Sequence, residues 1–356
     1  MKVGILGYGT IGSGILTLVQ GLPQSYGVEA TKVFDLPHKK EVLGPLYTAN
    51  ADDICLADDI DVVFEAMGGD AFAHRCIVNA LSSGKSVITS NKEVVSKHFE
   101  EFFALAKANG VYFLCEASVG GGIPCIRTLM HRVAFDRITN VYGILNGTTN
   151  FILTRMCEGQ SFDDALKTAQ KLGFAEADAT ADIEGLDVLR KISILSNIAY
   201  GTRLHYDQVK HYGIAGVTPS ILADVAARGK VLKMVAQSIP VGDTLKVSVE
   251  PVLLDKTHLL AAASDEYNMV VFDCEAGGTY ALYGKGAGRY PTADAMIGDL
   301  MDILQGNAAF TPMPAIAPAV SDFDQDSDYY VVRDGVAEIC HGLPADGNYT
   351  FYARLF

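Results

Sequence analysis

The chain has 356 residues, 49% of them hydrophobic, and a formal net charge of −14. This length predicts two domains or one large one, and the apolar content excludes disorder for most of the chain. The excess of acidic residues excludes nucleic acid and anionic membrane surfaces as partners, because both attract Lys and Arg. The sequence contains no apolar run long enough to span a bilayer and no secretory signal. Its seven cysteines lack paired spacing, so we expect reduced, mostly buried cysteines in a cytoplasmic protein. The partner that we expect is a small-molecule substrate.

The first predicted elements are a short strand at residues 3–6, the glycine motif GYGTIG and an amphipathic helix. The position of the motif between strand and helix favours a dinucleotide site over an unoccupied glycine turn. Gly7 would allow the tight turn, Gly9 the approach of a pyrophosphate, and Gly12 close packing of the helix on the strand. The helix start would offer backbone N–H groups to the phosphates. The residues assigned to the cofactor here are Gly7, Gly9, Thr10, Ile11 and Gly12.

A second strand is predicted to end at Asp35, 23 residues after Gly12. An acidic side chain at that place hydrogen-bonds the ribose hydroxyls of NAD and repels the 2′-phosphate of NADP. Lys39 and Lys40 follow closely and could reach a phosphate, and Asp35 could instead only cap the following turn. The sequence therefore favours NAD and leaves NADP open.

Further parallel strands are predicted at residues 62–65, 86–89 and 112–114, with helices at Ala71–Ser83 and Lys97–Asn109 between them. This rhythm predicts a Rossmann-type, doubly wound parallel sheet. Ligands bind such sheets beyond the carboxyl ends of the strands. Three segments rich in glycine and polar residues fall there, at residues 65–69, 90–92 and 116–124, and Met67 of the first segment is assigned to the cofactor.

The pattern changes after residue 127, where a second, α+β substrate-binding domain is predicted over residues 128–284. A strand at Val141–Leu145 leads into Asn-Gly-Thr-Thr-Asn. Asn-Gly can form a hairpin turn. The helical sequence that follows favours a strand-to-helix turn instead, and Asn146 and Thr148 are predicted to bind substrate there.

Four carboxylates crowd into the nine residues 176–184, ahead of a helix predicted from Gly185 to Tyr200 and closed by Gly201. On that helix Asp187 and Lys191 are four residues apart and share one face. They could form a surface ion pair of little energetic value. Alternatively, apolar neighbours enclose the lysine, which would then protonate a carbonyl oxygen as hydride arrives. Spare carboxylates could hold a substrate ammonium group.

A second glycine-rich loop, residues 284–288, opens a helix with Pro and Thr in its first turn. We interpret it as the return of the chain to the cofactor and assign Gly288 to cofactor binding. Residues 285–356 would comprise this return and a C-terminal tail. The acidic run between Asp322 and Asp328 is predicted to be a solvated linker.

Together, these segments resemble homoserine dehydrogenase over roughly residues 1–310, in the form without a C-terminal ACT domain. The NGTTN element and the Glu-Asp-Asp-Lys segment are the most specific parts. The segments that carry the resemblance are, in chain order, GYGTIGSG, SNKEVVS, EASVGGGIP, NGTTNFIL, GFAEADATADIEGLDVLRKISILSNIAYG and GAGRYPTADA.

The resemblance implies reduction of L-aspartate 4-semialdehyde to L-homoserine by NAD(P)H, a step toward threonine and methionine. Lys191 would be the general acid/base, and Lys92 would assist it near cofactor and substrate. The carboxylates implied to bind the amino-acid end of the substrate are Glu176 and Asp187, supported by Asp178 and Asp182.

The resemblance also implies a homodimer formed through the substrate-domain sheet. A structural monovalent cation, sodium, is implied and would be held mostly by backbone carbonyls of Glu116, Val119, Gly121 and Ile123. A ligand set with a single carboxylate suits such an ion better than zinc.

The chain departs from the family pattern at Phe34, where many members have Arg, and this favours NAD. Ala179 replaces a common Pro, and Ser90 a common Ala. Two alternatives remain: a dehydrogenase of the same fold for another amino-acid semialdehyde, and a non-catalytic NAD-binding paralogue. The second would be expected to lose Lys191 or Glu176, and the chain retains both.

Overall fold

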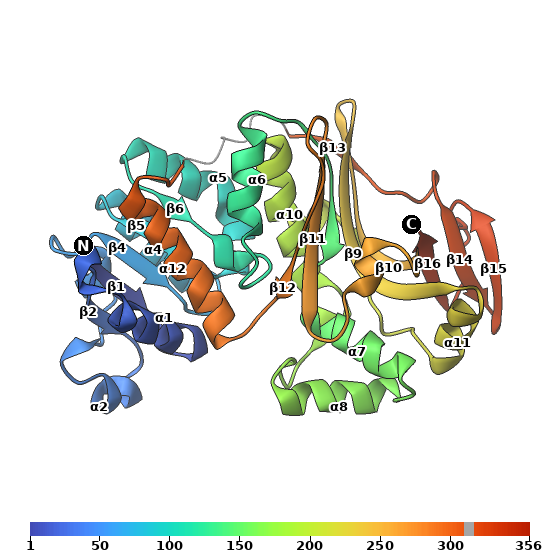
Figure 1. The fold of residues 1–356 in the computed structure, drawn as a ribbon, viewed down its shortest axis with the longest axis horizontal. Coiled ribbons are helices and arrows are strands. Elements are labelled where there is room, and N and C mark those ends of the chain that lie inside the picture. The colour runs from blue at the N-terminus through green and yellow to red at the C-terminus, as the bar shows by residue number, and fades with distance from the viewer. Residues whose placement is uncertain (310–316) are drawn as a thin grey trace. The chain divides into compact units, whose positions relative to one another are not determined.

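The computed structural model describes residues 1–309 and 317–356 (Figure 1). The chain divides into two compact units, each described here by itself. Unit 1 comprises Met1–His131 and Ala287–Ala315, and unit 2 comprises Arg132–Gly286 and Ile316–Phe356. Among the described residues, no helix has the length and apolar character needed to cross a membrane.

Unit 1 is built on a six-stranded sheet in which every pairing is parallel. Its order, β3-β2-β1-β4-β5-β6, is that of a dinucleotide-binding sheet. Successive strands are added on one side of β1 up to β3 and on the other side from β4 onward. The predicted Rossmann-type fold is therefore confirmed. The strands are β1 (Lys2–Leu6), β2 (Glu29–Phe34), β3 (Tyr47–Thr48), β4 (Val62–Glu65), β5 (Ser86–Thr89) and β6 (Phe113–Leu114).

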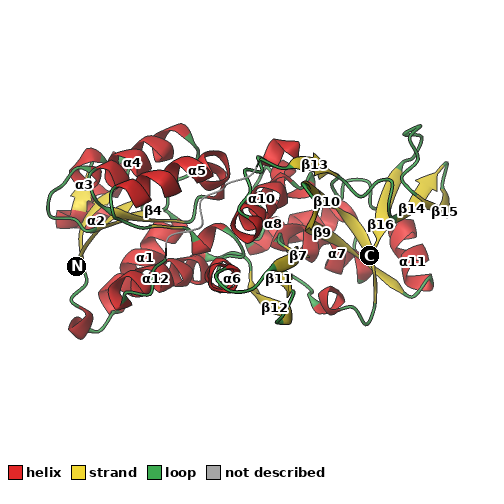
Figure 2. Ribbon diagram, turned by 90° about the horizontal axis from the view of Figure 1, so that it is seen from above, coloured by secondary structure: helices red, strands yellow, loops and turns green. Residues whose placement is uncertain are grey.

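Helices cover both faces of this sheet: α1 and α12 lie on one side and α4 and α5 on the other (Figure 2). Helix α12 comes from the far end of the sequence and completes the unit. The helices are α1 (Thr10–Gly21), α2 (Lys40–Leu43), α3 (Asp52–Cys55), α4 (Ala71–Ser82), α5 (Lys92–Ala108), α6 (Cys125–Val133, whose end falls in unit 2) and α12 (Arg289–Gln305).

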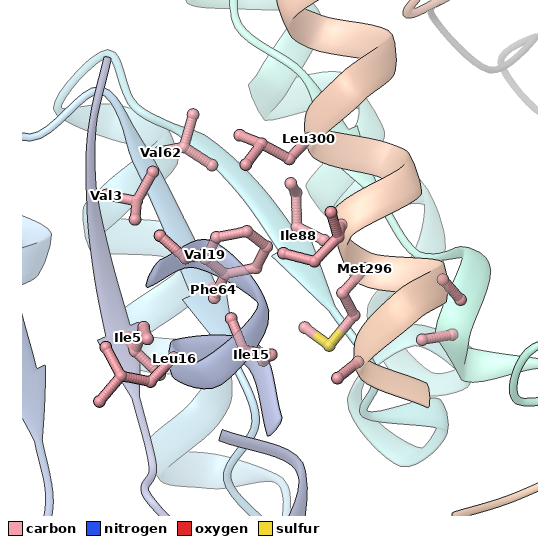
Figure 3. Packing of buried hydrophobic residues seen from close by; sticks show 14 of the residues in the cluster. Val3, Ile5, Ile15, Leu16, Val19, Val62, Phe64, Ile88, Met296 and Leu300 are labelled. Atoms are coloured by element: carbon pink, nitrogen blue, oxygen red, sulfur yellow. The ribbon is translucent and has the colours of Figure 1, made fainter. Parts of the chain in front are cut away.

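The core of unit 1 joins strand residues to both α1 and α12 (Figure 3). Because the central strands are buried on both faces, they are continuous apolar runs without alternation. Gly14 allows α1 and α12 to pack closely, since a Cβ there would lie 3.0 Å from the carbonyl oxygen of Arg289. The core residues labelled in the figure are Val3, Ile5, Ile15, Leu16, Val19, Val62, Phe64, Ile88, Met296 and Leu300.

Unit 2 contains a mixed sheet in the order β12-β11-β7-β9-β10-β16-β14-β15, with β8 and β13 also paired to β10. This confirms the predicted second α+β domain. Its strands are β7 (Ile138–Ile144), β8 (Lys210–His211), β9 (Lys230–Val241), β10 (Thr244–Asp255), β11 (Tyr267–Cys274), β12 (Gly278–Lys285), β13 (Ala319–Ser321), β14 (Asp328–Arg333), β15 (Val336–His341) and β16 (Phe351–Leu355).

The helices of unit 2 include α10, which was expected from Gly185 to Tyr200. It spans Leu186–Tyr200 and ends at Gly201 in the left-handed conformation, as predicted. The others are α7 (Gly147–Cys157), α8 (Phe162–Leu172), α9 (Thr180–Ile183) and α11 (Pro219–Ala227).

Two local predictions were wrong. Helix α5 begins at Lys92 rather than near Lys97, because the Asn91 side chain accepts a hydrogen bond from the N–H of Val94 and caps the helix there. The acidic run after residue 321 is not a solvated linker. Its carboxylates at Asp324 and Asp326 pair with lysines of unit 2, so this segment is fastened to the mixed sheet.

Candidate active site

The glycine motif of unit 1 makes a tight turn between β1 and α1. Gly7 has a φ of +94°, and a Cβ there would lie 2.8 Å from the carbonyl oxygen of Ala66. A Cβ on Gly12 would lie 1.8 Å from the carbonyl oxygen of Gly7. By contrast, a Cβ on Gly9 would meet no atom of the described residues within 4 Å. Gly7 and Gly12 are therefore required by the chain itself, whereas any need for glycine at position 9 must come from a ligand.

Helix α1 begins at Thr10 and Ile11, with Gly9 as its N-cap residue and no side-chain hydrogen bond to the cap. Thr10 is exposed and Ile11 half-buried. The first N–H groups of a helix carry partial positive charge and bind phosphates readily. This turn can therefore hold a pyrophosphate through backbone groups alone.

Asp35 directly follows β2 and binds the glycine turn. Its carboxylate accepts hydrogen bonds from the N–H of Tyr8 and, at 2.7 Å, from the N–H of Leu36. The second contact is the turn-capping role that the sequence left open, and the first joins the end of β2 to the glycine motif. The neighbouring Phe34 ring packs against Phe72 of α4, with centroids 5.7 Å apart.

A buried carboxyl group at the end of β4, Glu65, was not singled out from the sequence. It accepts hydrogen bonds from the N–H of Met67 at 2.8 Å and from the Thr89 hydroxyl. Burial raises the pKa of Glu65 to about 7, although these hydrogen bonds oppose the shift. The available signal was an acidic residue ending the apolar run VVF. Glu65 fixes the start of the Met67–Gly69 loop.

The next strand end is joined to the same loop through Asn91. The side-chain amide of Asn91 donates to the carbonyl oxygen of Gly69 at 2.8 Å, and the backbone N–H of Asn91 donates to the Thr89 hydroxyl at 2.9 Å. Lys92 follows as the first residue of α5 and is half-buried. The loops that carry Met67 and Lys92 are therefore held together at the carboxyl ends of β4 and β5.

Gly288 lies at the N-cap of α12 with a φ of +124°, a conformation that favours glycine. Pro291 and Thr292 stand in the first turn, as the sequence predicted. Gly288 belongs to unit 1, so the chain does return to the nucleotide-binding unit after residue 286.

The proposed cation loop follows β6. Glu116 is buried, and its two carboxylate oxygens accept from the N–H groups of Ile126 and Arg127 at 2.8 and 2.7 Å. The carboxylate thus caps α6, and burial raises its pKa to about 7. The carbonyl oxygen of Val119 accepts a weak thiol contact from Cys125, at 3.4 Å. Gly121 has a φ of +57° and curls the loop. A cation at this loop, which also includes Ile123, would rely on carbonyl oxygens, the hard ligands that suit a singly charged ion.

In unit 2 the Asp187–Lys191 pair is buried, not exposed. The exposed fractions of the two side chains are 4% and 8%, and the Lys191 ammonium donates to the Asp187 carboxylate at 2.7 Å. It also donates to the carbonyl oxygen of Leu145 at 2.6 Å. The carboxylate and the carbonyl oxygen together fix the position and direction of the buried ammonium.

Asn146 links this pair to the preceding strand. It caps α7 by accepting from the N–H of Thr149 at 2.8 Å, which confirms the predicted strand-to-helix turn. Its amide donates to Asp187 at 2.8 Å and to Asp182 at 2.7 Å. One asparagine thereby brings together two carboxylates that lie on different helices.

Glu176 stands outside this buried cluster. It is exposed on the loop between α8 and α9, and its backbone carbonyl accepts from Gln170 at 3.1 Å. Thr148 is buried and donates to the carbonyl oxygen of Phe174 at 2.6 Å, which attaches the same loop to α7. The structure therefore unites Asn146, Asp182, Asp187 and Lys191, whereas Thr148 and Glu176 lie along the adjoining loop.

Two family models match this chain. The model described as "Homoserine dehydrogenase, NAD binding domain" matches residues 7–116. Together with the parallel sheet, this match defines a nicotinamide-nucleotide-dependent oxidoreductase. The model described as "Homoserine dehydrogenase" matches residues 124–301, which include the lysine cluster.

The homoserine dehydrogenase of Bacillus subtilis is 39% identical over 318 residues, or 86% of this chain and 73% of the relative. The crystal structure of the homoserine dehydrogenase of Thiobacillus denitrificans has a TM-score of 0.89 at 29% identity and covers 100% of this chain and 98% of its own. A hyperthermophilic archaeal homoserine dehydrogenase in complex with NADPH has a TM-score of 0.75 at 26% identity, covering 87% and 99%. The chain belongs to the homoserine dehydrogenase family.

Proposed function

We propose that the protein interconverts L-aspartate 4-semialdehyde and L-homoserine and that Lys191 moves the proton. The buried hydrogen bond from the Lys191 ammonium to Asp187 carries this proposal. When bound, the nicotinamide supplies or accepts the hydride. In the direction of reduction, Lys191 gives its proton to the aldehyde oxygen as the carbon gains hydride, and the product is an alcohol. In oxidation, the neutral amine takes the hydroxyl proton back.

The surrounding carboxylates divide two tasks. Asp187 holds and orients the lysine, since the same Oδ2 atom accepts from Lys191 and from Asn146. Asp182, which is only half-buried, and Glu176, which is exposed, supply negative charge for the ammonium group of the substrate. Thr148 positions the loop that carries Glu176 through its bond to Phe174.

Unit 1 binds the cofactor through the glycine turn, the start of α1 and the loops that carry Met67, Lys92 and Gly288. NAD is the preferred cofactor. Phe34 brings no charge for a 2′-phosphate, and Asp35 would repel that group. The contact of Asp35 with Tyr8 supports this assignment because it places the carboxylate at the glycine turn.

The loop from Glu116 to Ile123 holds a monovalent cation through its carbonyl oxygens, and the active species is a homodimer. All seven cysteines are free thiols, which supports a reducing, cytoplasmic location. The molar mass from static light scattering tests the dimer. A change in Tm after dialysis into sodium-free buffer tests the bound ion.

The experiment that tests the reaction is spectrophotometric oxidation of L-homoserine at alkaline pH, run in parallel with NAD and NADP. We expect reduced cofactor to appear, and to appear faster with NAD. If NAD binds but is not reduced, the substrate assignment is wrong or the protein is a non-catalytic paralogue. Faster reaction with NADP would overturn only the cofactor preference.

A further inference from the structure

A cluster of imidazole and carboxylate groups lies on unit 1, apart from the residues assigned above to cofactor and substrate. His74 comes from α4, and His98 and Glu101 come from α5, three residues apart. We propose that these three side chains bind a divalent transition-metal ion, with zinc as the best fit. The proposal does not depend on the reaction that the protein catalyses.

The spacing of the three donor groups suits one small ion. His74 Nε2 lies 2.8 Å from Glu101 Oε2, and His98 Nδ1 lies 3.6 Å from the same oxygen. One ligand atom from each of the three residues lies within 4.8 Å of the others. Bonds of about 2.0–2.1 Å in a tetrahedral zinc site separate the ligand atoms by about 3.3 Å. Side-chain shifts of about 1 Å would therefore bring all three donor atoms to zinc-binding distance. The fourth coordination position would be left for water.

A second carboxylate orients one of the imidazoles. His98 Nε2 lies 2.9 Å from Asp70 Oδ1, and the other Asp70 oxygen accepts from Lys97 at 3.0 Å. When Nε2 donates its proton to Asp70, Nδ1 carries the lone pair and faces Glu101. This is the carboxylate–histidine arrangement that fixes the tautomer of a metal ligand and raises its basicity.

The surroundings permit an ion to enter and be held. Phe102 packs beneath both imidazole rings, with centroids 5.5 and 5.6 Å away, and provides an apolar base. The exposed fractions are 29% for His74, 27% for His98 and 48% for Glu101, so the open side faces water. Two imidazoles with one carboxylate favour zinc over magnesium or calcium, which prefer oxygen ligands alone.

A metal ion at this place would join α4 to α5 next to the cofactor loops. Asp70 is the N-cap residue of α4 and directly follows Gly69, whose carbonyl oxygen accepts from Asn91 at the N-cap of α5. An ion that binds only the folded protein raises its stability in proportion to the logarithm of its free concentration. Zinc should therefore stabilise unit 1 against heat.

Zinc titration of chelator-treated, tag-free protein by calorimetry tests the proposal, with Co²⁺ as a spectroscopic probe. We expect one saturable site per chain, visible Co²⁺ absorption typical of tetrahedral coordination, and a higher Tm with zinc. His74→Gln should lower zinc affinity at least tenfold and abolish the absorption. Its amide can still donate to Glu101, so the variant should fold. Asp70→Asn should weaken binding about tenfold by removing the carboxylate behind His98.

His341→Gln is the matched control, because His341 forms an exposed histidine–carboxylate pair with Asp328 at 2.9 Å but belongs to no such cluster among the described residues. It should bind zinc like the unaltered protein. Equal affinity in His74→Gln and the unaltered protein, or the absence of a saturable site, would overturn the proposal. Glu101→Gln provides the same test from α5, should His74→Gln fail to fold.

Discussion

The two units build their sites from different parts of the chain. Unit 1 uses mainly backbone: two glycines allow the turn, and helix α1 offers its first N–H groups. Unit 2 uses side chains that are almost completely buried, with Lys191, Asp187 and Asn146 in one hydrogen-bonded cluster. A site made of backbone groups tolerates substitutions that keep the backbone conformation. In a buried charged cluster, by contrast, removal of one partner leaves the other charge buried without compensation. This contrast predicts where substitutions should harm catalysis, binding or stability.

The largest effect is expected at the buried lysine. Lys191→Met keeps most of the aliphatic volume but removes the proton donor, so turnover of homoserine should fall by at least about 100-fold. Steady-state kinetics with saturating cofactor measure it. Lys171→Ala, at an exposed lysine of the same unit, should retain normal turnover. Near-normal activity in Lys191→Met would show that Lys191 is not the proton donor.

The next effect concerns the buried carboxyl group of unit 1. In the unfolded chain Glu65 titrates near 4.3, whereas burial raises its pKa in the folded protein to about 7. Between these values the folded state binds more protons than the unfolded state. The free energy of unfolding therefore falls as pH rises through this window, by up to about 4 kcal/mol from this group, and levels off above it.

Glu65→Gln cannot ionise and should lack this contribution. The stability of the unaltered protein relative to the variant should decrease from pH 5 to pH 8 in denaturant titrations. Other buried carboxyls with raised pKa, such as Glu116, remain in both proteins and cancel. Parallel pH profiles for the two proteins would show that Glu65 ionises normally in the folded state.

The glycine turn offers a matched pair of substitutions. Gly12→Ala places a Cβ 1.8 Å from the carbonyl oxygen of Gly7 and should destabilise the protein by about 2 kcal/mol or more. Gly9→Ala meets no atom of the described residues and should cost less than about 1 kcal/mol. Chemical denaturation measures both values. Equal losses of stability would contradict the distinction between a glycine that the chain requires and one that a ligand requires.

A smaller effect is expected on cofactor preference. Phe34→Arg should shift the ratio of NADP to NAD efficiency about tenfold or more toward NADP, because a hydrogen bond to a charged group is worth about 1.5–3 kcal/mol. Val42→Arg adds the same charge at an exposed site on α2 and should leave the ratio unchanged. An unchanged ratio in Phe34→Arg would mean that the 2′ position of the cofactor ribose does not lie near residue 34.

The smallest effect is expected in the acidic run between Asp322 and Asp328. Asp326→Asn removes the ion pair with Lys246, in which the Asp326 side chain is 63% exposed. Solvent screens such pairs, so thermal melts should show little or no fall in Tm. A clear fall in Tm would mean that the ion pair, rather than packing, holds this segment to the sheet.

The sequence predicted those features that short-range patterns encode. The strand–glycine–helix order indicated the Rossmann-type sheet, the spacing of Asp187 and Lys191 placed them on one face, and Gly201 ended their helix as expected. The Asn-Gly turn was also correctly predicted to lead into a helix.

Contacts between distant residues could not be read from patterns. Nothing local shows that Asn146 donates to both Asp182 and Asp187, or that the Leu145 carbonyl oxygen accepts a hydrogen bond from the lysine. The acidic segment looked solvated because its lysine partners, Lys210 and Lys246, lie about 80 to 114 positions away in the sequence. Burial decides the role of each such charge, and burial depends on the complete fold.

The most direct test of the account is titration of NADH into Lys191→Met and Gly9→Ala, followed by its fluorescence, since the chain has no tryptophan to interfere. The account predicts that Lys191→Met binds NADH like the unaltered protein although it cannot turn over. Gly9→Ala should fold but bind NADH at least tenfold more weakly. Weakened binding in Lys191→Met together with normal binding in Gly9→Ala would contradict the division of cofactor binding and proton transfer between the two units.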